Sequence, residues 1–173
     1  GFRWQGRPFK GKTMSRIISQ PLKPAKTGKG KQKPKGPYSL WQKKKADKMW
    51  SLAVRLRDGR CLICGKVGLP RKSDGLRVKG LDAHHLVGRS NLNYRFDLEN
   101  GITLCKYHHN CDDHIAAHGA NDVTARFMDW LGSTEHILWF EDNRDYRHAA
   151  KPNYLDEYNR LKVIVDELKK GTL

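Results

Sequence analysis

Four residues in the middle of the chain have the types and spacing of a site that cuts phosphodiester bonds with the help of a metal ion. His84 and His85 are adjacent, Asn100 follows them, and His109 lies nine residues beyond Asn100. Neighbouring side chains on a strand point to opposite sides, so His84 can bind a metal while His85 faces the substrate. A neutral imidazole can take a proton from water near physiological pH, which makes His85 the candidate general base.

The other two residues complete this candidate site. We expect His109 to lie on a helix that returns toward the strand and to hold, together with His84, a divalent ion such as Mg²⁺ or Mn²⁺. Such an ion needs open coordination positions for the phosphate oxygens. Asn100 falls between two expected strands, where its side-chain amide can tie the backbone of the loop. Asp113 and His114, which follow His109 on the same expected helix, remain alternatives as further ligands.

The cysteines predict a second, structural metal site. Cys61 and Cys64 are separated by two residues, and so are Cys105 and His108. Two such pairs on either side of a hairpin are typical of a closed tetrahedral Zn²⁺ site, which would hold the hairpin against the start of the helix. Cys111 is the alternative fourth ligand, but His108 keeps the two-residue gap and is preferred for that reason.

The chain is strongly basic, with 34 Lys and Arg against 18 Asp and Glu and a formal net charge of +16. Phosphate contacts release counterions, so this surplus favours a polyanionic partner, which we expect to be DNA. The segment 1–38 is rich in Gly, Pro and Lys and is expected to be a disordered arm that follows the phosphate backbone. No apolar run approaches the about 18 residues that cross a bilayer, and no export signal is visible. We therefore expect no membrane partner and a cytoplasmic location, in the host cell if the chain is phage encoded.

Hydrophobic periodicity and turn signals place the candidate site on a small α+β scaffold. A helical stripe covers 40–57 and ends before Gly59, and two short strands are expected over 81–87 and 102–104. A helix that begins near Lys106 would complete a β-β-α unit, and both halves of the motif would then face the same place.

Helical patterns continue after the motif. Helices are predicted over 123–131 and 152–170, whereas 136–140 is an apolar run of undetermined type. The apolar stripe of the last helix could also pair with a second copy, so a homodimer is one expected state. These patterns divide the chain into an arm at 1–38, a leading helix at 39–60, a core at 61–120 and a C-terminal helical extension at 121–173.

Two arginines in the loop inside the motif, Arg89 and Arg95, are candidates for contacts to DNA phosphates. They stand between His85 and Asn100, so their loop would border the phosphate that is cut. Their alternative role is plain solvation of this loop.

The segment 61–118 resembles the HNH endonuclease module, also called the ββα-metal fold. That module combines a His-His or Asp-His pair, an asparagine and a helix histidine nine residues further on, and is often held together by two cysteine pairs. The resemblance implies that His85 is the general base, that His84 and His109 are the metal ligands, and that Asn100 is the central asparagine.

A wider resemblance reaches the flanks of this segment. The stretches 45–48, 54–61 and 95–100, and the closing helix, are similar to the phage recombination endonuclease family NinG (Rap). This chain departs from that family at His84, where the family tends to have Gly, and at His108-His109, where it tends to have Cys-Asn.

Together the two resemblances imply a phage-encoded, metal-dependent DNA endonuclease that acts on branched or recombining DNA. They imply Zn²⁺ as the structural ion and Mg²⁺ or Mn²⁺ as the catalytic one. A non-catalytic zinc-stapled DNA-binding module and a basic phage assembly module are the alternatives. The intact histidine set favours the nuclease, because a module that only binds DNA has no use for His85.

Overall fold

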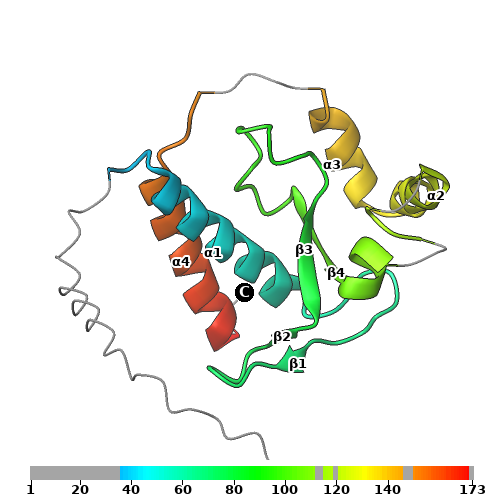
Figure 1. Ribbon diagram of the computed structural model, residues 1–173, viewed down its shortest axis with the longest axis horizontal. Coiled ribbons are helices and arrows are strands. Elements are labelled where there is room, and N and C mark those ends of the chain that lie inside the picture. The colour runs from blue at the N-terminus through cyan, green and yellow to red at the C-terminus, as the bar shows by residue number, and fades with distance from the viewer. Residues whose placement is uncertain (1–35, 112–114, 119–120, 146–149, 172–173) are drawn as a thin grey trace, which may run out of the picture. The chain divides into compact units, whose positions relative to one another are not determined.

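The computed structural model describes residues 36–111, 115–118, 121–145 and 150–171. The predicted arm, 1–38, therefore lies outside the described residues except for its last three positions, and Asp113 and His114 lie outside them entirely. The described chain is α+β, as the sequence predicts (Figure 1). In chain order its elements are α1 (Leu40–Asp58), β1 (Leu69–Pro70), β2 (Arg77–Lys79), β3 (Leu81–His85), β4 (Gly101–Cys105), η1 (Tyr107–Cys111), α2 (Asn121–Gly132), α3 (His136–Asn143) and α4 (Tyr154–Lys170).

The leading helix, α1, has ends that its sequence explains. The Ser39 side chain accepts a hydrogen bond from the Gln42 N–H at 3.3 Å and so caps the first turn. Gly59 ends the helix with φ of 66°, a left-handed conformation that glycine adopts without steric cost, and its N–H donates to the Arg55 carbonyl. The helix buries one face, made of Gln42, Ala46, Trp50, Leu52, Ala53 and Val54.

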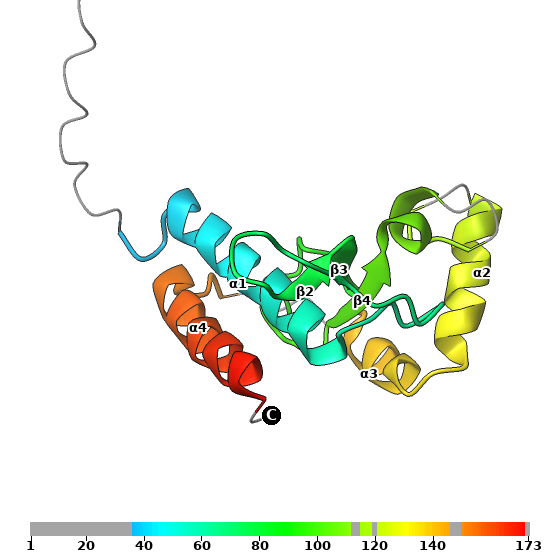
Figure 2. The ribbon, with the colours of Figure 1, turned by 90° about the horizontal axis from the view of Figure 1, so that it is seen from below.

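The last helix, α4, packs along α1 (Figures 1 and 2). It begins two residues later than predicted because Asn153 caps it, accepting hydrogen bonds from the N–H groups of Leu155 and Asp156 at 3.1 and 3.4 Å. Its buried residues belong to the predicted apolar stripe and join the hydrophobic clusters of α1, so that part of the stripe is used within the chain: Tyr154, Leu161 and Val165. The homodimer stays a prediction.

Strands β3 and β4 form the antiparallel pair that carries the motif. The register places His85, at the end of β3, opposite Gly101, at the start of β4. A Cβ atom at Gly101 would lie 2.6 Å from Val54 and 2.7 Å from Trp50. The glycine therefore lets α1 approach the strand pair closely enough to contact the residues beside His85.

The elements around this pair differ from the prediction in detail. β3 ends at His85 rather than at residue 87, and the helix expected from Lys106 is the short π-helix η1. The undetermined run at 136–140 is helical and belongs to α3. A second antiparallel pair, β1 and β2, forms a hairpin between the two halves of the cysteine motif. No helix within the described part of the chain combines the length and the apolar character that crossing a bilayer requires.

Candidate active site and metal centres

The predicted structural metal site is assembled by the fold. The ligand atoms of Cys61, Cys64, Cys105 and His108 all lie within 4.8 Å of one another. The His108 Nδ1 atom lies 3.5 Å from the Cys61 sulfur and 3.3 Å from the Cys105 sulfur, and the Cys64 and Cys105 sulfurs are 4.0 Å apart. Tetrahedral Zn²⁺ ligands lie about 3.3–3.8 Å apart, as follows from bond lengths of about 2.0–2.3 Å. This group can therefore hold a structural metal ion such as Zn²⁺.

Local backbone structure explains how these four ligands meet. The chain turns sharply after Cys61, where the N–H of Gly65 donates to the Cys61 carbonyl at 2.8 Å and the glycine has φ of 70°. The N–H of Leu62 donates to the Thr103 carbonyl at 3.0 Å, which ties this turn to β4. Cys105 ends β4 and His108 lies in η1. The site therefore joins the turn after α1, the strand and the π-helix, as the spacing predicts; the side chain of the alternative ligand, Cys111, lies outside the description.

A second group of three histidines gathers on one side of β3. The ligand atoms of His84, His109 and His118 lie within 4.8 Å of one another. The ring centroids are 5.5 Å apart for His84 and His109, 4.8 Å for His84 and His118, and 5.0 Å for His109 and His118. His84 is buried, and its Nδ1 atom has no hydrogen-bond partner among the described residues. Three imidazoles that converge in this way can hold one divalent ion.

His118 is a candidate ligand that the sequence analysis missed. It stands nine residues after His109, beyond the helix that carries the motif, so no helical spacing connects the two. Two backbone hydrogen bonds return it to the site: the N–H of Ala117 donates to the His108 carbonyl and the N–H of His118 to the His109 carbonyl, both at 3.0 Å. The only sequence signal was a further histidine close to the motif.

Asp82 lies beside this histidine group. Its Oδ2 atom is 3.4 Å from the Nδ1 atom of His109. A carboxylate that contacts the second nitrogen of a ligating histidine fixes the orientation of the ring and raises its basicity. Asp82 therefore suits the role of a positioning residue for His109.

His85 points to the other side of β3, which confirms the expected separation of the two adjacent histidines. Its ring stacks on Trp50, with centroids 3.5 Å apart and an interplanar angle of 14°. Its Nε2 atom lies 2.9 Å from the Arg95 carbonyl oxygen, which can only accept, so the proton of the neutral ring is on Nε2. The Nδ1 atom then carries the lone pair. It is shielded and has no hydrogen-bond partner among the described residues.

Burial keeps both adjacent histidines neutral. It lowers the pKa of His85 from 6.5 to about 4; the hydrogen bond to the Arg95 carbonyl raises the pKa, while the charge of Arg89 lowers it. Burial also lowers the pKa of His84 to about 3, with the neighbouring His118 and His109 next in effect. A metal ligand and a general base must both be unprotonated, so these directions suit both assigned roles.

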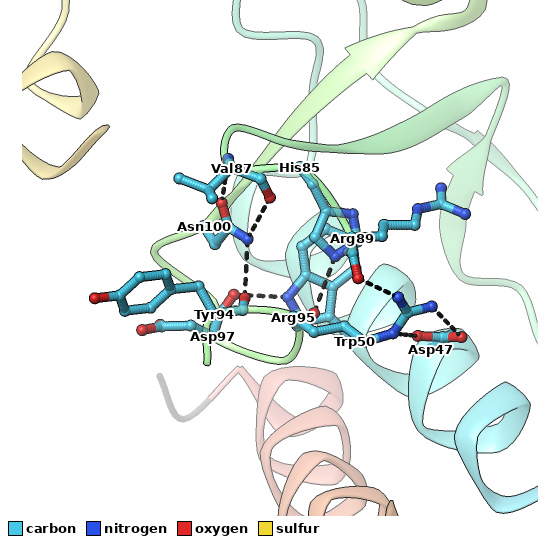
Figure 3. A network of polar contacts seen from close by, with 9 residues as sticks. All are labelled: Asp47, Trp50, His85, Val87, Arg89, Tyr94, Arg95, Asp97 and Asn100. Carbon is cyan, nitrogen blue, oxygen red and sulfur yellow. Dashed lines mark hydrogen bonds and ion pairs between the residues drawn. The ribbon is translucent and has the colours of Figure 1, made fainter. Parts of the chain in front are cut away.

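Asn100 fixes the loop that follows β3 (Figure 3). It is completely buried, and its Oδ1 atom accepts a hydrogen bond from the Val87 N–H at 2.6 Å. Its Nδ2 group donates to the carbonyls of Val87 at 3.0 Å and Tyr94 at 2.9 Å. The amide thus ties the loop backbone, as expected, and Asn100 is a positioning residue whose polar atoms bond the protein itself.

The two arginines of this loop differ in their surroundings. Arg95 is 8 % exposed, and its Nε and Nη2 atoms pair with both carboxylate oxygens of Asp47 at 2.9 and 3.0 Å. Its Nη1 group donates to the Arg89 carbonyl (Figure 3). Three of the five N–H groups of the Arg95 guanidinium thus bond partners inside the protein, and its phosphate contact stays a prediction. Arg89, by contrast, is exposed.

One cavity brings the two functional groups together. Its volume is about 330 Å³, and its lining includes His85, Arg89 and all three histidines of the second group. The candidate base and the candidate metal ligands therefore line the same space. No family model, no curated protein and no solved structure matches this chain, so the geometry of the site itself carries the functional argument.

Proposed function

We propose that the protein is a metal-dependent DNA endonuclease. The observation that carries the proposal is the cavity in which His85 meets the three-histidine group. His85 is neutral, its Nε2 is fixed by a carbonyl, and its Nδ1 has no partner among the described residues. A buried polar atom without a partner is costly, so this nitrogen suits a bound water or substrate atom.

His85 supplies the general base of the proposed reaction. Its Nδ1 atom takes a proton from water as the oxygen attacks the phosphorus, the bond to the 3′ oxygen breaks, and the leaving 3′ oxygen takes a proton from solvent water. His84, His109 and His118 would hold the divalent ion, Mg²⁺ or Mn²⁺. When bound, that ion polarises the phosphoryl group and neutralises the charge that develops on its oxygens. Asn100 and Arg95 keep the loop and the His85 ring in place.

The cysteine site supports this arrangement. His108 belongs to the structural group, whereas the next residue, His109, belongs to the histidine group. A Zn²⁺ ion on His108 would therefore fix the backbone that carries His109. Because the ligands come from the turn, β4 and η1, the structural ion would hold η1 against the strand pair.

The net charge of +16 and the resemblance to HNH and NinG proteins support DNA as the substrate. The NinG resemblance also supports a phage origin and branched or recombining DNA as the form that is cut. The test is cleavage of linear, nicked, flap and four-way DNA with Mg²⁺ or Mn²⁺. Cleavage that His85→Ala abolishes supports the nuclease. DNA binding without any cleavage would favour the alternative, a zinc-stapled binding module.

A further inference from the structure

A second cavity adjoins the candidate active site. Its volume is about 510 Å³, within the range of about 300–1,000 Å³ that is usual for ligand sites. Part of its wall is the face of α1 that contains Trp50 and Arg55, and the other lining residues include Arg71. Its lining shares Ala83, His85 and Arg89 with the cavity of the histidine group. The two cavities therefore meet at the candidate base.

The lining of this second cavity is cationic. Its described lining includes four basic residues, Lys48, Arg55, Arg71 and Arg89, and one carboxylate, that of Asp47. Both oxygens of Asp47 already pair with Arg95. An anion that enters the cavity therefore meets several positive charges, and among the described lining residues it meets no unpaired carboxylate.

Arg55 is held in place as a donor. Its Nε and Nη1 groups donate to the carbonyls of Ser51 at 2.9 Å and Leu81 at 3.4 Å. Its Nη2 group makes no hydrogen bond to any residue that the structure describes. Burial, and next the charge of Arg71, lower the pKa of Arg55, and the charge of Asp82 opposes them. A half-buried guanidinium that lies near a second positive charge is stabilised when an anion binds beside it.

The other two arginines have guanidinium groups that a ligand can recruit. Arg71 pairs with Asp74, but both side chains are about one-third exposed, at 33 % and 36 %, and such surface pairs contribute little stability. The Arg89 guanidinium makes no hydrogen bond or ion pair with the part of the chain that the structure describes, and its side chain extends away from the polar network in Figure 3. Arg55, Arg71 and Arg89 thus reach one cavity from α1, the β1–β2 turn and the loop after β3.

We propose that this second cavity binds a backbone phosphate of DNA, next to the phosphate that is cut, through Arg55, Arg71 and Arg89. A guanidinium can donate two parallel hydrogen bonds to a phosphate, which suits arginine to this role better than lysine. Such contacts place the strand without reading its sequence. The claim that this phosphate lies beside the one that is cut rests on the proposed function. The claim that the second cavity binds a phosphate does not.

The test is the salt dependence of DNA binding by the full chain, measured by fluorescence anisotropy with a labelled duplex and no added divalent ion. We expect Arg71→Gln and Arg89→Gln each to weaken binding and to reduce the log–log salt slope by about 0.9, the value for one lost phosphate contact. Arg126→Gln is the matched control, because it removes the same charge from an exposed site on α2 outside the cavity. Unchanged melting temperatures show that the variants remain folded.

The outcomes separate this inference from the proposed nuclease. Slopes for Arg71→Gln and Arg89→Gln equal to that of Arg126→Gln would overturn the phosphate site, even if the wild type cuts DNA. Reduced slopes in a protein that cuts no DNA with Mg²⁺ or Mn²⁺ would support the phosphate site and overturn the nuclease. Arg55→Lys keeps the charge but loses the Nε and Nη1 hydrogen bonds that hold the free Nη2 group in place, so we expect weaker binding with little change in slope.

Discussion

His85 stacks on Trp50 with ring centroids 3.5 Å apart and planes 14° from parallel. Trp50 is itself fixed, because it is 1 % exposed and its Nε1–H donates to the Asp97 carbonyl at 2.7 Å. The plane of the candidate base is therefore set by α1, an element outside the ββα unit. The Arg95 carbonyl sets the rotation of the ring within that plane.

Replacing Trp50 should separate stacking from general packing. Trp50→Phe keeps an aromatic face under His85, whereas Trp50→Leu removes it. We expect Trp50→Leu to lower the single-turnover cleavage rate at least about tenfold and Trp50→Phe to retain most of it, because loss of a correct reacting geometry costs rate. Both changes remove buried volume and should lower the melting temperature. Equal cleavage rates in the two variants would contradict a role for the stack.

The ion pair between Asp47 and Arg95 should matter for both stability and cleavage. Asp47→Asn leaves the guanidinium of Arg95, which is 8 % exposed, without its charge partner. We expect a loss of roughly 1–3 kcal/mol in the free energy of unfolding, the usual cost of an unsatisfied buried group. Cleavage should also fall, because the Arg95 carbonyl holds His85. The matched control is Asp122→Asn, which breaks an exposed pair with Arg126 and should change stability by less than about 1 kcal/mol.

Acid should destabilise the protein through its buried neutral histidines. The pKa of His85 is about 4 in the folded protein and 6.5 ordinarily, so between these values the unfolded chain binds more protons. The contribution of the neutral His85 ring to the free energy of unfolding is present above pH 6.5 and is lost as the pH falls toward 4. Denaturant titrations without added Mg²⁺ or Mn²⁺ should show a slope of at most about 1.4 kcal/mol per pH unit from this group. His85→Gln should lack the His85 contribution to this slope. An identical pH dependence of stability in the wild type and His85→Gln would contradict the burial of a neutral His85.

Removal of the structural metal should unfold the core, since binding of structural Zn²⁺ is largely folding free energy. We expect purified protein to hold about one tightly bound Zn²⁺ per chain by elemental analysis. Cys61→Ser should lose that ion and the native circular dichroism spectrum, because Cys61 is completely buried in the group. A folded, zinc-free wild type would contradict this role.

The third histidine should affect metal binding rather than folding. His118 is exposed, and its ligand atoms lie within 4.8 Å of those of His84 and His109. His118→Ala should therefore keep the zinc content and the fold while raising the Mg²⁺ or Mn²⁺ concentration needed for half-maximal cleavage about 10- to 100-fold, as changes around metal sites often do. His136→Ala, on α3 outside both the cysteine site and the histidine group, is the control. An unchanged metal requirement would remove His118 from the site.

Local patterns in the sequence were sufficient to predict those parts of the site that depend on the spacing of residues. The two-residue gaps predicted the Cys61, Cys64, Cys105 and His108 group, and strand alternation predicted that His84 and His85 would separate. The position of Gly59 predicted the end of α1, because its left-handed conformation is a local requirement.

Contacts between distant elements could not be found in this way. Asp47 and Arg95 are 48 residues apart, and the stack of Trp50 on His85 depends on how α1 lies against the strand pair. In the sequence Trp50 is only one of several apolar residues on a helical face. His118 is likewise held at the site by backbone hydrogen bonds from Ala117 and His118 to η1, which no helical period describes. Tertiary packing, rather than spacing, brings these residues to the candidate base and the candidate metal ligands.

The most direct test of the central claim is single-turnover cleavage of DNA by the wild type and by His85→Ala with saturating Mg²⁺ or Mn²⁺, accompanied by DNA affinity and zinc content. The loss of a general base should lower the rate by roughly 10²–10⁴-fold. Affinity and zinc content should be unchanged, because the zinc ligands lie elsewhere and phosphate contacts dominate binding. Cleavage by His85→Ala at the wild-type rate would contradict the account.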